Sequence, residues 1–247
     1  MAITGTLSRS VLADQVKERI LEDILSGRHE PGSRIIETQV ARELGTSQAP
    51  VREALRGLEA LGVVDITPFR GSRVRRPSRR EILEAYAVRS TLEGLGARLA
   101  VPLMTDADLS ELAGHLEAMR AAARNDDGHA LAEADARFHG RIVELADNGT
   151  LLKVWRSLEP FSRTYITLVI PGADTQWSAD LHAPILAALE RRDADAVVDA
   201  LGRHFDEVAD NLARRWPDDE SPAPRDTPPP GHPQPTTTDR HASRRTT

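Results

Sequence analysis

The 247-residue sequence has no cysteine, few aromatic residues and no long apolar run, and each absence narrows what the protein can be. Without cysteine the chain forms no disulfide and offers no thiolate to a metal, so any metal ligands must be His, Asp or Glu. Aromatic residues make up only 4% of the chain, which favours a core of packed aliphatic side chains. Neither a membrane span of about 18 apolar residues nor the apolar run of a signal peptide is present. We therefore expect a cytoplasmic protein without membrane contact.

The charge of the chain is unevenly distributed along its length. The formal net charge is -6, yet residues 1–78 carry 12 Lys and Arg against 10 Asp and Glu. Residues 79–216 carry 16 Lys and Arg against 23 Asp and Glu. Because a local basic excess is what attracts phosphates, the N-terminal part is free to approach a nucleic acid. The same asymmetry is compatible with an acidic enzyme that carries a neutral interaction module.

Residues 8–76 show the order of a winged helix-turn-helix domain. Aliphatic side chains recur every four positions over residues 10–26, which predicts a helix with one apolar face. Thr38 is expected to cap a short second helix, and Thr46 or Ser47 a third. The segments VVDIT and SRVRR follow and are typical of two short strands joined by a tip.

The chain beyond this domain has a helical pattern. Ser78 and Glu81 form a capping-box sequence, which predicts the start of a new helix. Apolar periodicity predicts helices over residues 79–100, 106–123, 128–147, 150–169 with a kink or break at Pro160, 181–191 and 194–215. The fold class is therefore mainly α, with a bundle of about six helices over residues 79–216. Residues 217–247 hold eight of the sixteen prolines and are expected to be disordered.

The predicted third helix has a polar face suited to reading DNA. Gln48, Arg52 and Arg56 lie four residues apart, opposite the apolar side, so they can reach base edges and phosphates. The hydroxyl and backbone amides at the helix start can contact a phosphate. Arg70, Gly71 and Arg73 are expected to form a basic hairpin tip that suits the minor groove or the adjacent DNA backbone. The candidate DNA-binding residues are Ser47, Gln48, Arg52, Arg56, Arg70, Gly71 and Arg73. Alternatively, these arginines only solvate a surface helix, as in helix-turn-helix modules that bind protein.

A second group of residues indicates a metal site in the helical part. Asp135 and His139 are spaced i,i+4 beside apolar residues, so they should point inward, where an unpaired carboxylate is costly. His182, in the first turn of a later helix, and His204, on an apolar stripe of the last helix, also face the interior. One Asp and three His suit a divalent metal such as Zn, Ni or Mn. Alternatively, each histidine is a hydrogen-bonded core residue, and the Asp/His pair is a helix-surface contact.

The run PGSRIIETQVARELGTSQAPVREALRGLEALGVVDITPFRGSRV closely resembles the DNA-binding domain of the GntR family of bacterial regulators, especially its FadR-type branch. The DNA contacts that this resemblance implies are Ser47, Gln48 and Arg52 on the recognition helix and Arg70 and Gly71 on the wing. Gln48 stands where relatives often have Arg, and Thr38 where some have a DNA-contacting Arg, so no relative's base preference is transferable. The resemblance also implies a homodimer on a double-stranded, pseudo-palindromic DNA operator.

Residues 79–214 resemble the FCD domain, the helical effector module usually joined to this DNA-binding type. The resemblance rests on VRSTLEGLGARLA, DARFHGRIVELADNGTL, LHAPILAALERRDADAV and GRHF. In metal-containing members the ligands are one Asp and three His, which match Asp135, His139, His182 and His204. The resemblance favours an open site that also binds a small carboxylate effector, and Arg89 could pair with that effector bidentately. The alternative for Arg89 is an exposed ion pair with Glu93.

These patterns predict a DNA-binding transcriptional regulator, a repressor that its ligand releases from DNA, and not an enzyme. The location expected for such a regulator is the cytoplasm, on the bacterial nucleoid. One alternative is a metal-dependent hydrolase, because open Asp and His ligands can activate water. That reading leaves residues 8–76 without a role, and no further general base stands out. A second alternative is a protein-binding adaptor whose winged domain no longer contacts DNA.

Overall fold

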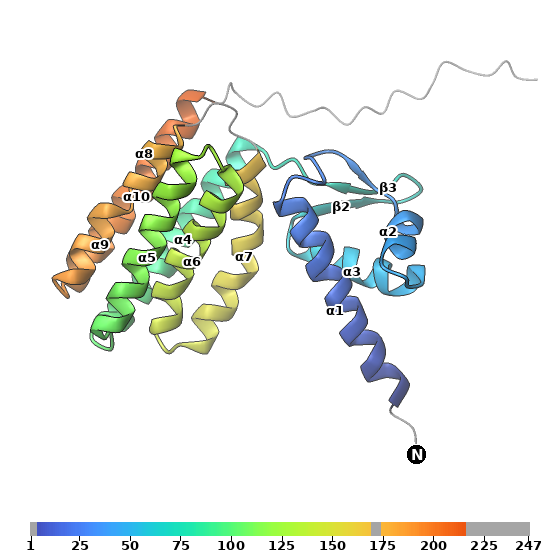
Figure 1. Ribbon diagram of the computed structural model, residues 1–247, viewed down its shortest axis with the longest axis horizontal. Helices are drawn as coiled ribbons and strands as arrows, with labels where there is room; N and C mark the ends of the chain where they lie inside the picture. Colours follow the sequence, from blue (N-terminus) through green and yellow to red (C-terminus); the bar gives the residue numbers. More distant parts are fainter. Residues whose placement is uncertain (1–3, 169–173, 216–247) are drawn as a thin grey trace, which may run out of the picture.

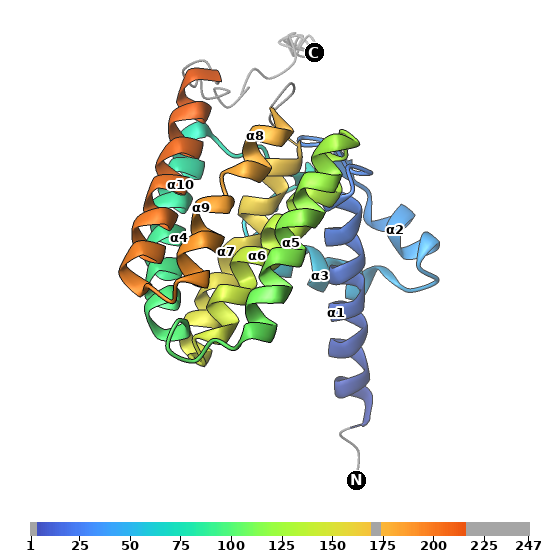
Figure 2. The ribbon, with the colours of Figure 1, turned by 60° about the vertical axis from the view of Figure 1, so that its left-hand side comes forward.

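A computed structural model describes the backbone of residues 4–168 and 174–215 and the side chains of residues 11–158 and 174–214. Its elements form two groups, a small one that contains the sheet and a larger bundle of helices (Figure 1, Figure 2). The predicted fold class, mainly α with a winged helix-turn-helix followed by a helical bundle, is confirmed. The tail over residues 217–247, for which we expect disorder, lies outside the described part.

The first group is a winged helix-turn-helix with a three-stranded antiparallel sheet of order β1-β3-β2. Its elements are α1 (Thr4–Leu25), β1 (Arg34–Ile35), α2 (Glu37–Glu43), α3 (Gln48–Ala60), β2 (Val64–Thr67) and β3 (Gly71–Val74). Both α1 and α2 pack against α3, and the aliphatic side chains between them form one buried core. Two expectations were wrong: α1 begins at Thr4 and not near residue 10, and the sheet has β1 as a third strand. A two-residue strand is too short to produce a recognisable alternation.

The caps of α2 and α3 differ from the expectation. The N-cap of α2 is Ile36, with extended backbone angles (φ -95°, ψ 108°), and Thr38 lies inside the helix. The prediction that Thr38 caps this helix is therefore wrong, and the acidic Glu37 occupies the first turn, near the positive end of the helix dipole. Ser47 is the N-cap of α3 by backbone position, but its side chain accepts no hydrogen bond from the helix. Its exposed hydroxyl therefore stays available.

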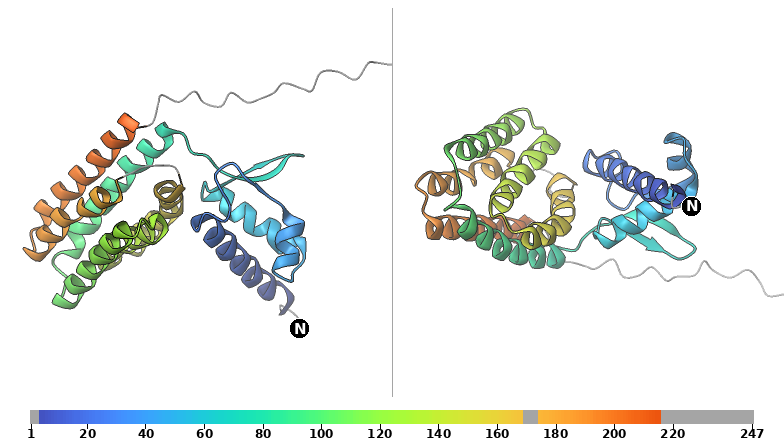
Figure 3. Two further views of the ribbon diagram at one scale, coloured as in Figure 1. Left: turned by 45° about the horizontal axis from the view of Figure 1, so that its top comes forward. Right: turned by 90° about the horizontal axis from the view of Figure 1, so that it is seen from below.

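The second group is an all-helical bundle around an aliphatic core. Its helices are α4 (Arg79–Ala100), α5 (Asp106–Arg124), α6 (Gly128–Leu145), α7 (Gly149–Leu168), α8 (Thr175–Asp180), α9 (Ala183–Glu190) and α10 (Ala194–Arg215). The predicted capping box of Ser78 and Glu81 is confirmed at the start of α4. The helix α4 packs against α6, α7 and α10, so much of its surface is covered (Figure 3). Among the described residues, no helix combines the length and apolarity that crossing a bilayer requires.

The structure corrects details of two helix predictions in the bundle. The helix expected over residues 181–191 is α9, which spans only Ala183–Glu190, so His182 is its N-cap and not a residue of its first turn. The short helix α8 before it was not expected. Pro184 lies in the first turn of α9, where its missing amide does no harm, and this favours a helix start at this point. Of the two possibilities at Pro160, the break does not occur, since α7 is one helix from Gly149 to Leu168, and the kink stays a prediction.

The turn between β2 and β3 places a large side chain in an unfavourable backbone conformation. Arg70 N donates to Thr67 O at 3.0 Å, and Phe69, the third residue of the turn, has a φ of 63° and a fully exposed ring. A left-handed conformation costs a residue with a Cβ about 1–2 kcal/mol, whereas glycine adopts it freely. We expect Phe69→Gly to raise the free energy of unfolding by about 0.5–1 kcal/mol after the larger chain entropy of glycine is included.

A urea denaturation series measures this effect, with Thr67→Gly as the matched control. Thr67 ends β2 in an ordinary strand conformation, so glycine there should lower stability by about 0.5–1 kcal/mol. A Phe69→Gly protein less stable than the parent would show that the ring stabilises the fold.

Candidate nucleic-acid interface and candidate metal centre

The helix α3 separates an apolar side from a polar side. Its buried residues are Pro50, Val51, Ala54, Leu55 and Leu58. The side chains of Gln48, Arg52 and Arg56 are exposed, as their four-residue spacing predicts. A recognition helix needs long polar side chains that are not packed inside the protein, and α3 meets this requirement.

Two neighbours hold the guanidinium of Arg52 in place. Arg52 Nε donates to Glu37 Oε2 at 2.7 Å, and Arg52 Nη2 donates to Gln48 Oε1 at 2.9 Å. The Arg52 side chain remains 57% exposed, so the ion pair contributes little to stability but restricts where the guanidinium lies. Glu37 was not identified from the sequence. It lies 15 residues upstream on α2, and spacing along one helix cannot reveal such a contact.

The wing carries arginines on its strands as well as at its tip. Arg70 and Gly71 occupy the tip, where Gly71 has a φ of 83°. Arg73 lies on β3, not at the tip as expected, and its Nη1 donates to the backbone oxygen of Gly32 at 3.0 Å. Arg34, on β1, is the cross-strand partner of Arg73. Its guanidinium packs close to Gly71, so that a side chain at that position would place its Cβ only 3.2 Å from Arg34 Nη2. Like charges opposite each other are unfavourable in a sheet, so this pair favours an anionic partner.

Arg34 was missed by sequence reasoning, because a two-residue strand gave no sign of where its side chain would lie. It is exposed and has no hydrogen-bond or ion-pair partner among the described side chains. It extends the candidate nucleic-acid interface from the wing tip along the sheet.

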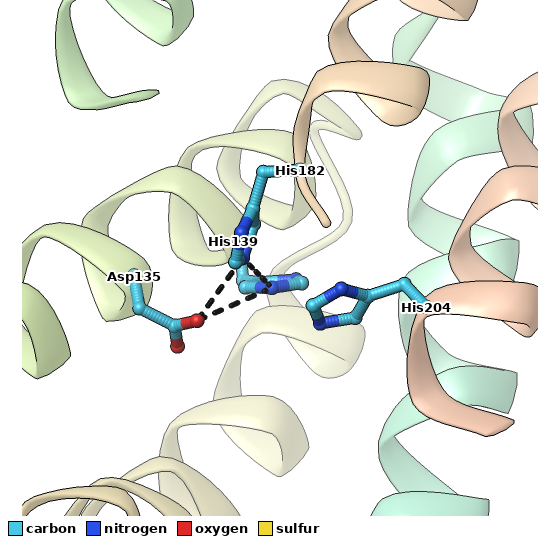
Figure 4. A group of neighbouring side chains, drawn as sticks. All are labelled: Asp135, His139, His182 and His204. Atoms are coloured by element: carbon cyan, nitrogen blue, oxygen red, sulfur yellow. Dashed lines mark hydrogen bonds and ion pairs between the residues drawn. The ribbon is translucent and has the colours of Figure 1, made fainter. Parts of the chain in front are cut away.

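The predicted metal ligands come together inside the bundle. Asp135 and His139 lie on α6, His182 lies between α8 and α9, and His204 lies on α10 (Figure 4). All four side chains are buried, and one ligand atom from each lies within 4.8 Å of the others. The set consists of three imidazoles and one carboxylate.

Hydrogen bonds to the outer ring nitrogens aim two of the histidines at the centre. His139 Nδ1 lies 2.5 Å from Glu93 Oε2, and His182 Nδ1 lies 3.1 Å from the carbonyl oxygen of Ser178. A ring nitrogen that faces an acceptor carries the proton, which leaves both Nε2 lone pairs pointing inward. The two Nε2 atoms are 3.1 Å apart, and His182 Nε2 is 3.1 Å from Asp135 Oδ1. Two Nε2 lone pairs that face each other at 3.1 Å repel unless a proton or a metal ion lies between them. A metal ion bound to both nitrogens would remove this repulsion.

The spacing and the unpaired atom in this cluster both suit a metal. Two atoms bound to one metal at about 2.0–2.2 Å lie roughly 2.8–3.1 Å apart at a right angle and roughly 3.3–3.6 Å apart at the tetrahedral angle. The Nε2 separation of 3.1 Å agrees with the right angle of a six-coordinate site. His204 Nδ1 is buried without a hydrogen-bond partner among the described residues, an arrangement that is costly unless something binds the ring. Burial, and then the charges of His182 and His139, hold the pKa of His204 well below its usual value. The ring therefore stays neutral and able to donate a lone pair.

Asp135 supplies the negative charge of the cluster. Burial alone would raise the pKa of its carboxyl, but His139 and the hydrogen bond with His182 hold that pKa below its usual range. The residues present therefore fit a borderline divalent cation such as Zn, Ni or Mn, because they offer neutral nitrogens and one carboxylate oxygen.

Arg89 does not form the exposed ion pair considered as an alternative. It does pair with Glu93, but its side chain is only 3% exposed and that of Glu93 is 0% exposed, so the expectation of an exposed pair is wrong. The reason is the packing of α4 against three other helices. The guanidinium carbon of Arg89 lies 5.6 Å from the ring centre of Trp155 and 5.4 Å from that of Phe205. Arg89 Nη2 makes no well-aligned hydrogen bond, although it is buried.

Both parts of the chain match known family models. The model described as "Bacterial regulatory proteins, gntR family" matches residues 12–74, and the model of the FCD domain matches residues 84–207. The "Probable D-xylose utilization operon transcriptional repressor" of Paenarthrobacter nicotinovorans is 36% identical over 203 residues, which cover 82% of this chain and 89% of the relative. The gluconate operon transcriptional repressor of Bacillus subtilis is 26% identical over 216 residues, covering 85% of this chain and 88% of the relative.

Solved structures have the same fold. The structure of McbR/YncC from Escherichia coli has a TM-score of 0.70 at 25% identity and covers 83% of this chain and 99% of that one. A putative transcriptional regulator from Rhodococcus sp. RHA1 has a TM-score of 0.75 at 23% identity, with coverage of 83% and 99%. The likeness extends over both groups of elements.

Proposed function

Because the chain belongs to the GntR family of bacterial regulatory proteins and has an FCD domain, we propose that it is a ligand-responsive repressor that binds its operator as a homodimer. The family assignment confirms the resemblance and identifies a transcriptional regulator in place of an enzyme, so the hydrolase alternative is abandoned. The observation that carries the proposal is the exposed polar face of α3, with Gln48, Arg52 and Arg56 on it.

On DNA, α3 would lie in the major groove and the wing against the adjacent minor groove. Gln48 and Arg52 would face base edges, and the unused hydroxyl of Ser47 a phosphate. The wing would contact the DNA backbone through Arg70, Gly71 and Arg73. Arg34 would lie beside them on the sheet, and Arg56 would lie further along α3. The close approach of the tip is favoured by the missing side chain at Gly71.

An exposed apolar stripe on α4 supports the proposed homodimer. Its members, Val88, Leu95 and Leu99, are 48%, 46% and 37% exposed and lie on one face of the helix. The hydroxyl of Thr91, in the same stripe, is bonded to its own helix at Ala87 O, so its methyl group adds to the apolar surface. A two-fold contact along this stripe would bury it against its copy. Since α4 directly follows the wing, the contact would also fix the distance between the two recognition helices.

We expect Leu95→Arg to weaken self-association at least about tenfold, because it places two like charges in an apolar contact. Val154→Arg, at a position on α7 that is 42% exposed, is the matched control and should leave the dimer intact. Sedimentation velocity over a concentration series measures both variants. A Leu95→Arg protein that stays dimeric at the parent's concentrations would exclude α4 as the dimer face.

The buried cluster would hold the metal through Asp135, His139, His182 and His204. A bound Zn, Ni or Mn ion would act there as a Lewis acid that attracts the carboxylate of a small organic acid. Arg89 has a buried Nη2 that is not used in a well-aligned hydrogen bond, and this atom could complete the recognition of the acid. One relative is named for a gluconate operon, and gluconate is an organic acid, whereas the relative with 36% identity is named for a D-xylose operon, and D-xylose has no carboxylate.

Binding to labelled fragments from upstream of the protein's own gene tests the proposal. Anisotropy titrations at several salt concentrations should show affinity that falls as salt rises, with a slope of about -0.9 per phosphate contact. Candidate organic acids, added with the metal, should then change that affinity. A chain that binds none of these fragments at low ionic strength would remove the DNA-binding proposal, and acids that bind the bundle without changing DNA affinity would remove the ligand response.

A further inference from the structure

Glu93 contacts both halves of the proposed effector site. Its side chain is completely buried on α4, and its two carboxylate oxygens face in different directions. Glu93 Oε2 lies 2.5 Å from His139 Nδ1 on one side. On the other side, Glu93 Oε1 accepts hydrogen bonds from Arg89 Nε at 3.0 Å and from Trp155 Nε1 at 2.8 Å. A single carboxylate therefore joins a metal ligand to Arg89 and Trp155.

The geometry points to Glu93 as a positioning residue that fixes the His139 ring for the metal and holds Arg89 beside the site. This inference rests on the metal site of the proposed function. Because Glu93 Oε2 faces Nδ1 of His139, the ring keeps its proton on that atom and directs the lone pair of Nε2 inward. The metal itself need not contact Glu93. The carboxylate acts by preventing the ring from turning or from placing its proton on Nε2.

The arrangement of Arg89 distinguishes this role from that of a structural ion pair. A buried pair that serves stability alone favours two parallel hydrogen bonds, one to each carboxylate oxygen. Here Arg89 Nε and Nη2 both approach Oε1, at 3.0 and 2.9 Å, and Oε2 is left to His139. Arg89 gives up good hydrogen-bond geometry at Nη2 as a result.

Both carboxylate oxygens of Glu93 face hydrogen-bond donors, as this role requires. Oε1 accepts from Arg89 Nε and Trp155 Nε1, and Oε2 lies against His139 Nδ1. A side chain with only one accepting end cannot replace it.

The substitution Glu93→Gln tests the inference with almost no change in shape. The glutamine amide accepts hydrogen bonds only at its oxygen, and its NH₂ group is a donor. The NH₂ group must therefore face either His139 Nδ1 or the N–H groups of Arg89 and Trp155, which are donors as well. In the full chain, stripped of metal by a chelator, we expect the affinity for Co²⁺ to fall about 10–100-fold. The visible absorption band of bound Co²⁺ should also change, because the geometry of His139 changes.

The control variant Trp155→Phe removes a donor to Glu93 Oε1 but leaves the contact to His139 in place. Its Co²⁺ affinity should stay within about threefold of the parent, well below the loss expected at a broken outer contact. If Glu93→Gln lowers thermal stability but binds Co²⁺ with the parent's affinity and spectrum, Glu93 has only a structural role and the inference is overturned. If the parent binds no Co²⁺, the metal site of the proposed function itself is wrong.

A measurement without substitution covers the case in which Glu93→Gln does not fold. In the metal-free parent labelled with ¹⁵N-histidine, long-range proton–nitrogen spectra report which ring nitrogen carries the proton. We expect His139 to be protonated at Nδ1. A neutral His139 ring that carries its proton on Nε2 would overturn the inference.

Discussion

Replacing Asp135 with alanine should lower the affinity of the chain for Zn²⁺ about 100-fold or more. A four-ligand protein site binds Zn²⁺ with about 10–16 kcal/mol, so an average ligand contributes roughly 2.5–4 kcal/mol, and the one anionic ligand should contribute at least that. Asp135 is the only carboxylate of the cluster, and its Oδ1 lies 3.1 Å from His182 Nε2. Its loss leaves three neutral imidazoles, which bind the doubly charged ion without contributing any negative charge.

Metal analysis of the purified protein and competition with a chromophoric chelator measure this loss. Asp108→Ala is the matched control, because Asp108 is a largely buried aspartate outside the cluster that completes the capping box of α5 with the N-cap Thr105 and pairs with Arg141 at 2.6 Å. It should cost about 1 kcal/mol of stability through the lost cap while the metal content is retained. Equal metal content in Asp135→Ala and in the parent would place the metal elsewhere.

The residues that the sequence identified most reliably are those whose positions follow from one helix. Gln48, Arg52 and Arg56 are exposed because a spacing of four keeps them on one face of α3, opposite its buried residues. The same rule puts Asp135 and His139 side by side on α6, where Asp135 Oδ1 and His139 Nε2 lie 3.8 Å apart. In both cases the local period of the helix decides the outcome.

The contacts between distant segments did not follow from such a period. His182 and His204 lie on other elements. Their helical spacing predicted only that they face the interior, and the family resemblance then assigned them to one site with His139. The pair of Arg89 and Glu93 has the spacing of a surface ion pair, but the packing of α4 against α6, α7 and α10 buries it. Burial of this kind depends on the tertiary arrangement, and it turns the spacing of a weak surface pair into a buried pair that contacts His139.

Short elements were the least predictable. The strand β1 has two residues, and α8 has six, so neither shows a full period of apolar residues. The N-cap of α2 is Ile36 because of its extended backbone angles. The side chain of Thr38 is favourable for a cap, so the sequence suggested the wrong residue. Because of these errors, His182 was predicted in the first turn of a helix and not at the junction of α8 and α9, and Arg34 was not recognised. Both residues belong to the candidate sites.

Replacing Arg52 with alanine should weaken binding to the operator at least about 30-fold. A bidentate contact to a base contributes about 1–3 kcal/mol, and a homodimer loses two of them, so the total loss is roughly 2–6 kcal/mol. The slope of log affinity against log salt should become less steep if Arg52 contacts a phosphate, and should stay nearly constant if it contacts a base. Titrations of a specific and a scrambled fragment at several salt concentrations separate the two cases.

Arg137→Ala is the matched control, because Arg137 is 61% exposed, pairs with Glu133 four residues away and lies on α6 in the bundle. The two variants lose the same charge and a similar exposed ion pair, so a difference in DNA affinity reports the position of Arg52 and not the net charge. Glu37→Gln adds a second comparison, since it removes a negative charge beside the proposed interface but keeps an acceptor for Arg52. It should bind DNA as tightly as the parent or more tightly. If Arg52→Ala and Arg137→Ala have equal affinities for the operator, α3 is not the reading helix.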